Sequence, residues 1–208
     1  MALHNQRPSR GFLVLGPESS GTRMTARLLV LAGCRPTAVV GGDDGPEPPP
    51  DDRPPVIRRS APHWHPPAGP HEWPDVPALV GALDVDEAVA VVTTRDWFAT
   101  AASQVDRGHV PDLGRAYANL RRAYRQIFGG IVASGIPFVV SAYEAFVARR
   151  DHRRLLLRSL GLPDGVDLDV FDGNDARYAG SRCGPDAAWA GEPREAGSPP
   201  GGGGKLRV

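Results

Sequence analysis

Short runs of apolar residues alternate with longer amphipathic stretches along the chain. Residues 12–15, 88–92 and 137–140 are continuous apolar runs, typical of strands that are buried on both faces. A further short strand is predicted at residues 37–40, and residues 56–57 are predicted to form an extended dipeptide. These segments together predict a largely buried sheet.

The stretches between the strands have the apolar spacing of helices. Helices are predicted over residues 22–32, 76–83, 96–106, 112–134, 143–148 and 151–160. The longest has one apolar stripe, which predicts a face packed on the core: Leu113, Tyr117, Leu120, Tyr124, Ile127 and Ile131. Strands alternating with helices predict an α/β fold, a three-layer sandwich with a mainly parallel central sheet. Ligands of such sheets bind at the carboxyl ends of the strands, which are followed here by the loops after Leu15, Ile57, Thr93 and Val140.

The length and composition predict one domain followed by a tail. Residues 1–179 are predicted to form a single domain, in which residues 41–77 are an irregular loop on the substrate side. Residues 180–208 are rich in glycine and proline, which predicts a flexible tail.

Charge and cysteine content exclude several classes of partner and site. Basic and acidic residues number 24 each, so no nucleic-acid partner is expected, and the basic run at 149–154 is interpreted as the solvated face and end of a helix. Two cysteines, Cys34 and Cys183, indicate neither a disulfide framework nor a zinc site. No apolar stretch reaches the ~20 residues of a membrane span, and the N-terminus is polar, so a cytoplasmic protein is expected. The frequent arginine, alanine, glycine and proline suggest a bacterial genome of high GC content.

The loop after the first strand, GPESSGTRM, has the glycine spacing of a phosphate-binding loop. Gly16 and Gly21 are separated by four residues, but Thr22 and Arg23 follow where a nucleotide-hydrolysing loop has lysine and then serine or threonine. An anion cradle remains, because hydroxyl groups, the close approach that Gly21 allows and a helix N-terminus all favour a bound anion. The predicted anion contacts are Ser19, Ser20, Gly21, Thr22 and Arg23. The alternative is a simple helix cap, which needs only one side-chain acceptor.

A second polar segment, VVTTRDWFATAASQ, follows another predicted strand. Arg95 stands at the carboxyl end of the strand, and Ser103 lies eight residues later, about two turns into the following helix. By itself this pair is a weak signal, because an arginine near a helix start often pairs with a carboxylate such as Asp96.

Taken together, these segments resemble the sulfotransferases that use 3′-phosphoadenosine 5′-phosphosulfate (PAPS). The sequence SGT at residues 20–22 resembles the family's 5′-phosphosulfate loop, and the preceding Gly16-Pro17 resembles that of its carbohydrate-sulfating members. Arg95 and Ser103 resemble the family's 3′-phosphate site in type and spacing. A YEAF turn at 143–146 and a GLP stop at 161–163 resemble the family's closing segment. The resemblance spans about residues 11–163 and implies a P-loop fold of the sulfotransferase type, with PAPS as sulfuryl donor and a small-molecule or carbohydrate acceptor.

One position departs from the family pattern. The family usually has lysine or arginine directly before SGT, against the transferring group, and Ser19 stands there in this chain. Either Arg23 supplies this charge, or the protein binds a nucleotide without catalysis. A P-loop kinase of a small metabolite is a further alternative, which the missing lysine disfavours.

The candidate base comes from a loop rich in histidine. Sulfuryl transfer to a hydroxyl group or an amine requires positioning, charge stabilisation and a base near neutral pH, and no metal is expected. The predicted catalytic residues are His63, Arg59 and Arg23, with His63 as base or acceptor contact. Alternatively, His63 and its neighbours decorate a polar loop, or His63, His65 and His71 bind a metal. Trp64 and Trp73 are interpreted either as stacking on an acceptor or as anchoring this loop to the core.

Overall fold

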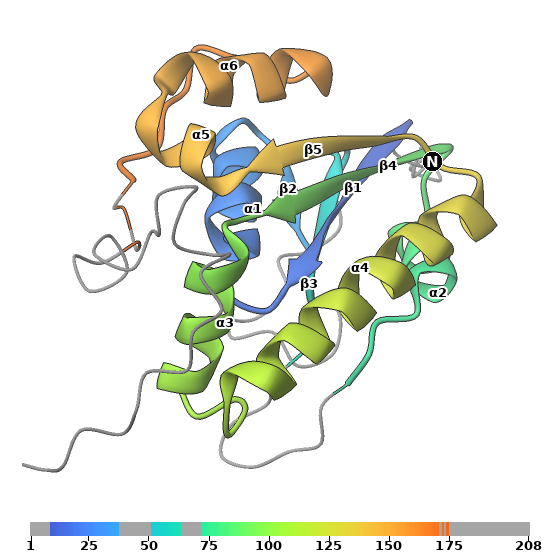
Figure 1. The fold of residues 1–208 in the computed structure, drawn as a ribbon. Helices are drawn as coiled ribbons and strands as arrows, with labels where there is room; N and C mark the ends of the chain where they lie inside the picture. Colours follow the sequence, from blue (N-terminus) through green and yellow to red (C-terminus); the bar gives the residue numbers. More distant parts are fainter. Residues whose placement is uncertain (1–8, 38–50, 64–71, 171, 173, 175–208) are drawn as a thin grey trace, which may run out of the picture. The chain divides into compact units, whose positions relative to one another are not determined.

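A five-stranded, all-parallel sheet forms the centre of the protein (Figure 1). The computed structural model describes residues 9–37, 51–63, 72–170, 172 and 174. The strands lie in the order β2-β3-β1-β4-β5. Their bounds are β1 (Arg10–Pro17), β2 (Arg35–Pro36), β3 (Pro55–Ala61), β4 (Glu87–Thr94) and β5 (Phe138–Ala142).

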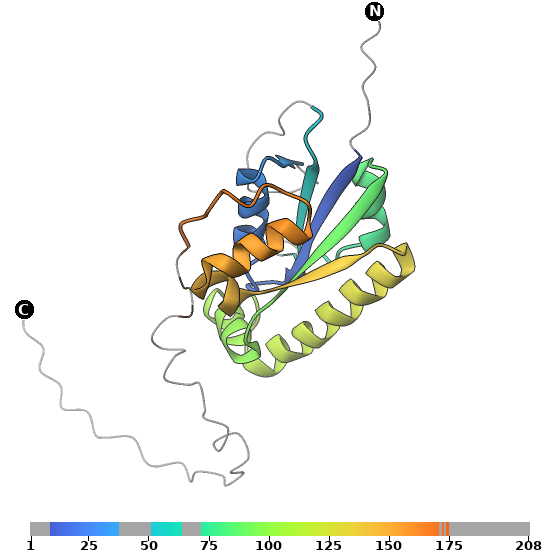
Figure 2. The same cartoon turned by 90° about the horizontal axis from the view of Figure 1, so that it is seen from above.

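Helices cover both faces of the sheet (Figure 2). They are α1 (Thr22–Leu31), α2 (Val76–Leu83), α3 (Trp97–Asp106), α4 (Leu113–Ser134), α5 (Tyr143–Ala148) and α6 (Arg150–Ser159). Alternate residues of the strands point to opposite faces, so Phe12 and Val14 pack against α1 and α6, whereas Leu13 and Leu15 pack against α2 and α4. The predicted layered α/β fold and its parallel sheet are therefore confirmed.

The chain divides into residues 1–173 and 174–208, and the helices and strands of the described residues belong to the first unit. The tail predicted at 180–208 lies outside the described residues. Among the residues that are described, no helix combines the length and the apolar character needed to span a bilayer.

Strand β3 is longer than its sequence indicated. It extends over seven residues and lies between β2 and β1, although only a dipeptide was predicted as extended. Residues 41–77 were predicted to form an irregular loop, and this prediction is wrong for the residues of β3. The two arginines of the strand, Arg58 and Arg59, interrupt the apolar run that would have indicated it. Likewise, β2 begins at Arg35, two residues before the predicted strand, and residues 38–40 of that prediction are outside the described part.

The basic run at residues 149–154 is not wholly solvated. Arg153 is 6% exposed, donates from Nη1 to the Phe146 carbonyl at 2.7 Å, and bonds through Nε to Asp167 Oδ1 at 2.9 Å. The interpretation as a solvated helix face is therefore wrong for this residue, which joins α6 to α5 and to the segment after α6.

The connections leaving the two neighbouring strands β1 and β4 run to opposite faces of the sheet. After β1 the chain enters α1 on one face, and after β4 it passes through α3 to α4 on the other. Open α/β sheets bind ligands at the carboxyl ends of strands whose connections diverge in this way.

Candidate functional site

The loop between β1 and α1 has two residues with positive φ. Ser19 has φ 69° and Gly21 has φ 98°, so the backbone turns sharply before the helix begins. A Cβ atom on Gly21 would lie 2.8 Å from Tyr143 Cδ2, and one on Gly16 would overlap Thr93 Oγ1 and Ser20 Oγ. Both glycines of the predicted phosphate-binding loop are thus required by close packing.

Helix α1 has no side chain that caps its N-terminus. Helices α2, α3 and α4 are each preceded by an N-cap aspartate whose side chain accepts a hydrogen bond from a backbone N–H group of the helix: Asp75, Asp96 and Asp112. Gly21 holds the same position in α1 and makes no such bond. The alternative of an ordinary side-chain cap is therefore not what the loop forms. Ser19 Oγ, just before the helix, is buried without a hydrogen-bond partner. An anion at this end would be bound by the helix N–H groups and would satisfy that hydroxyl group.

The two hydroxyl residues at the helix start are buried. Ser20 is 1% exposed, and its Oγ lies 2.6 Å from Thr93 Oγ1 at the end of β4. Its hydroxyl group therefore fastens the loop to the sheet. Thr22 is 6% exposed, whereas Arg23 lies exposed in the first turn of α1. Thr93 was not among the predicted site residues, although its place in a TT pair at a strand end is a weak signal of such a role.

Arg95 joins the loop to the YEAF segment. Its Nη1 donates to the Ser19 carbonyl at 2.9 Å, and its guanidinium group lies 4.5 Å from the centre of the Tyr143 ring. The same ring limits the space beside Gly21. Next to Arg95, the backbone N–H of Asp96 donates to Glu144 Oε1 at 2.9 Å. Three segments far apart in the sequence thus meet at one end of the sheet.

Helix α3 supports the loop from a second side. Gln104 is 1% exposed, and its Nε2 donates to the Glu18 carbonyl at 2.9 Å. Sequence reasoning missed this residue, because a glutamine in a helix has no local signature. Ser103 beside it is the seventh residue of α3 and is 7% exposed, while Arg95 precedes the helix cap.

His63 lies at the same edge of the sheet. The Glu18 N–H donates to the Ala61 carbonyl at 3.4 Å, which brings the end of β3 next to the loop. His63 is 7% exposed, and its Nδ1 lies 3.1 Å from Ser60 Oγ. It forms a backbone bridge with Glu72, whose Oε2 also accepts from Arg59 Nη2 at 3.4 Å. The histidine is therefore held in a packed setting rather than on a solvated loop.

The other residues predicted around His63 have different outcomes. Trp64, His65 and His71 lie outside the described residues. Trp73 is partly buried against the core cluster under α2 and α4, as expected for an anchor. In the described ranges, no three histidine, cysteine or carboxylate side chains gather as metal ligands.

Tyr124 of α4 lies close to this site. Burial, with the negative charge of Glu144, raises the pKa of Tyr124 to about 12, and a hydrogen bond to the Arg95 backbone opposes the shift. The phenol therefore keeps its proton at neutral pH.

The arrangement can bind an anion at the start of α1 and brings a buried histidine to the same edge of the sheet. Comparison with models of known protein families and with curated proteins finds no match. The geometry of this site is therefore the basis for assigning a function.

Proposed function

We propose that this protein is a sulfotransferase of the P-loop type, which moves a sulfuryl group from PAPS to a hydroxyl group or amine of a small-molecule or carbohydrate acceptor. The observation that carries the proposal is the meeting of three separate segments. Arg95 contacts both Ser19 of the loop and Tyr143 of the YEAF segment. The order of the parallel strands brings the three segments to one edge of the sheet, and the contacts of Arg95 join them there.

The residues at the start of α1 fit an anionic donor. The helix end lacks a side-chain cap, Ser19 Oγ is buried without a partner, and Arg23 places a cation in the first turn. We assign the 5′ phosphosulfate to Ser19, Gly21, Thr22 and Arg23, and the 3′-phosphate to Ser103 with Arg95. Ser20 and Arg95 also hold the loop in shape. When bound, PAPS would supply the sulfuryl group.

His63 is the proposed base that accepts the proton of the acceptor. In the tautomer whose Nδ1–H donates to Ser60 Oγ, the lone pair is carried by Nε2. The backbone bridge to Glu72 fixes the position of the residue. Arg59, 4% exposed, brings a positive charge next to this segment, where it would stabilise negative charge on the transferring group.

Calorimetric titration with 3′,5′-adenosine bisphosphate tests the donor site. Wild type is expected to bind, and Arg95→Ala and Ser103→Ala are expected to weaken binding by about tenfold or more, the typical loss of a charge-assisted hydrogen bond. Circular dichroism of each variant checks that weakened binding does not result from unfolding. Absence of binding by wild type, or unchanged affinity in both alanine variants, contradicts the proposal.

A second candidate, a nucleotide-binding protein without catalysis, is favoured by Ser19 at the usual basic position. Substitution of two exposed arginines of α1 distinguishes the two candidate functions. Arg23 lies in the first turn of the helix, and Arg27 lies one turn further on and serves as the control. If Arg23 stabilises the transferring group, Arg23→Ala lowers kcat by about 10²-fold, whereas Arg27→Ala has little effect. Mass spectrometry of mixtures of wild type, PAPS and a panel of hydroxyl and amine acceptors provides the decision. A sulfated product excludes the binding protein, and nucleotide binding with no product from any acceptor supports it.

A further inference from the structure

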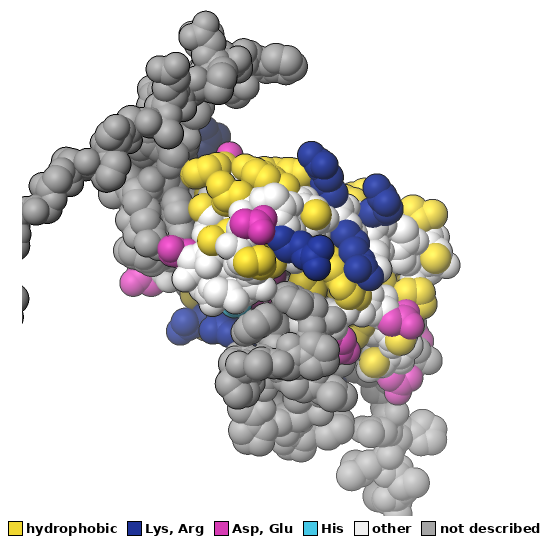
Figure 3. Space-filling model, turned by 60° about the horizontal axis from the view of Figure 1, so that its bottom comes forward, with side chains coloured by type: hydrophobic (Ala, Val, Ile, Leu, Met, Phe, Trp, Pro, Cys, Tyr) yellow, Lys and Arg dark blue, Asp and Glu magenta, His cyan; other side chains and the backbone are white. Residues whose placement is uncertain are grey.

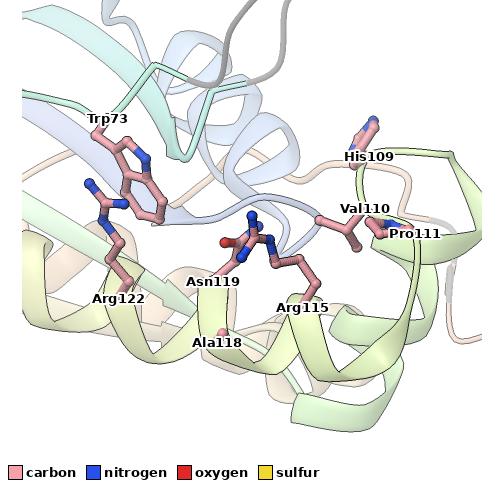
Figure 4. Close-up of a pocket in the computed structure, with 8 residues that line it drawn as sticks. All are labelled: Trp73, His109, Val110, Pro111, Arg115, Ala118, Asn119 and Arg122. Atoms are coloured by element: carbon pink, nitrogen blue, oxygen red, sulfur yellow. The ribbon is translucent and has the colours of Figure 1, made fainter.

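A cleft of about 460 Å³ lies along α4. Figure 4 shows Trp73 and Arg122 at one end, His109 and Val110 at the other, and Arg115 with Asn119 on the helix between them.

The helix that forms one wall of the cleft is strongly basic. Helix α4 contains four arginines and no acidic residue, although the whole chain has equal numbers of basic and acidic residues. Figure 3 shows basic side chains grouped on the face of the molecule that carries this helix. Arg115 and Arg122 line the cleft, and their spacing of seven residues places them on the same side of α4. No carboxylate among the residues that the structure describes forms an ion pair with either of them.

The cleft also has flat and apolar surfaces. The guanidinium group of Arg122 lies 4.0 Å from the centre of the Trp73 ring, and this stacking restrains its N–H donors. Val110 and Pro111 form an apolar wall at the opposite end, and Asn119 adds an amide. A guanidinium group binds carboxylate or sulfate oxygens in a forked geometry, while the apolar wall suits a ring.

One end of the cleft is linked to the β1–α1 loop, and the other to the segment of His63 and Arg59. The backbone N–H of His109 donates to the Gln104 carbonyl at 2.9 Å, and the Gln104 side chain binds the Glu18 carbonyl of the loop. At the other end, Trp73 directly follows Glu72 in the sequence. Glu72 forms a backbone bridge with His63, and its side chain pairs with Arg59. These contacts link the cleft to the β1–α1 loop at one end and to the His63 segment at the other.

We infer that the cleft binds the acceptor, and that this acceptor is an anionic ring compound: its carboxylate or sulfate group is bound by Arg115 and Arg122, and its ring lies against the apolar wall of Val110 and Pro111. The assignment of the ligand as acceptor rests on the proposed function. The binding site itself rests only on the lining of the cleft.

Two glycosides that differ in one charged group test the inference. The full chain is titrated without nucleotide with 4-nitrophenyl β-D-glucuronide, its neutral match 4-nitrophenyl β-D-glucoside, and sodium sulfate. The glucuronide is expected to bind at least about tenfold more tightly than either of the others, because only it offers both the anion and the rings. Equal affinity for the two glycosides, or no binding of the glucuronide, overturns the inference. Sulfate binding as tightly as the glucuronide overturns the role of the ring.

Two further arginines of the same helix provide matched controls. Arg115→Ala and Arg122→Ala are each expected to weaken glucuronide binding by about tenfold. Arg121→Ala and Arg125→Ala remove equally exposed charges that do not line the cleft, and are expected to change affinity by less than about twofold. Equal losses in all four variants would indicate general attraction by a basic helix and overturn the site. All four side chains are exposed, so folding is checked simply by circular dichroism.

Failure of this inference can be distinguished from failure of the proposed function. If 3′,5′-adenosine bisphosphate fails to bind while the glucuronide binds through Arg115 and Arg122, the proposed function fails and the anionic site stands. If the nucleotide binds and the two glycosides bind equally, the inference fails and the sulfotransferase proposal stands.

Discussion

The contact between Gly21 and Tyr143 can be tested by adding one methyl group. In Gly21→Ala, the backbone at φ 98° puts an L-residue in a region that costs about 1–3 kcal/mol. The new Cβ would also lie 2.8 Å from Tyr143 Cδ2, and such overpacking typically costs about 1–3 kcal/mol. Tyr143 has little room to yield, because it is 6% exposed and lies under the Arg95 guanidinium group. Reduced freedom of the unfolded chain returns about 0.4–1 kcal/mol, so the expected loss of stability is about 1–6 kcal/mol.

Gly33 is the matched control for this substitution. Its φ of 100° is nearly the same, but no atom lies within 4 Å of a Cβ built on it, so Gly33→Ala has the backbone strain without the clash. Its loss is expected to be smaller by about 1–3 kcal/mol, which urea unfolding followed by circular dichroism resolves. Equal losses in the two variants would show that Tyr143 moves aside without cost, and the argument for tight packing at Gly21 would be wrong. If the tyrosine is displaced, Gly21→Ala should also weaken binding of 3′,5′-adenosine bisphosphate, whereas Gly33→Ala should not.

Three other features of the fold give predictions of their own. Thr93→Val leaves the buried Ser20 hydroxyl group without its partner and should reduce the free energy of unfolding by about 1–3 kcal/mol. Thr93→Ser keeps the hydroxyl group, so its free energy of unfolding should fall clearly less in the same urea experiment. The hydrogen bond from Arg153 lowers the pKa of Asp167 below 3.8. The ionised carboxylate therefore stabilises the folded state above pH 3.8, and this stabilisation is lost as the pH falls through the pKa of the folded state. Unfolding between pH 6 and 2 should therefore show a shallower loss of stability in Asp167→Asn than in wild type, and identical slopes would refute the linkage. Burial raises the pKa of Cys34 to about 12, so little reactive thiolate is present at pH 8. In a Cys183→Ser variant, Cys34 is the remaining thiol. It should react with Ellman's reagent at pH 8 at least about a thousandfold more slowly in the folded protein than in the urea-unfolded protein. Rapid labelling of the folded chain would show that the thiol is accessible.

Hydrophobic patterning was enough to locate the strands β1, β4 and β5 and the long helix α4. These elements are indicated by neighbours in the sequence, since a buried strand needs a continuous apolar run and a packed helix needs a stripe. Patterning failed at β3, where Arg58 and Arg59 interrupt the run. That strand forms because β1 pairs with it from Val56 to Ala61 and β2 pairs with its first two residues.

The sequence by itself determined that a glycine-rich loop follows a buried strand and leads into a helix, because these features depend on residues next to one another. Only the tertiary structure decided what each polar side chain of the loop does. Ser20 was predicted to bind an anion, yet its hydroxyl group meets Thr93, which is 73 positions away. Arg95 reaches the Ser19 carbonyl across a similar separation. A hydroxyl or guanidinium group bonds to whichever partner the fold brings within about 3 Å, and the chain order of distant strands and helices does not specify that partner.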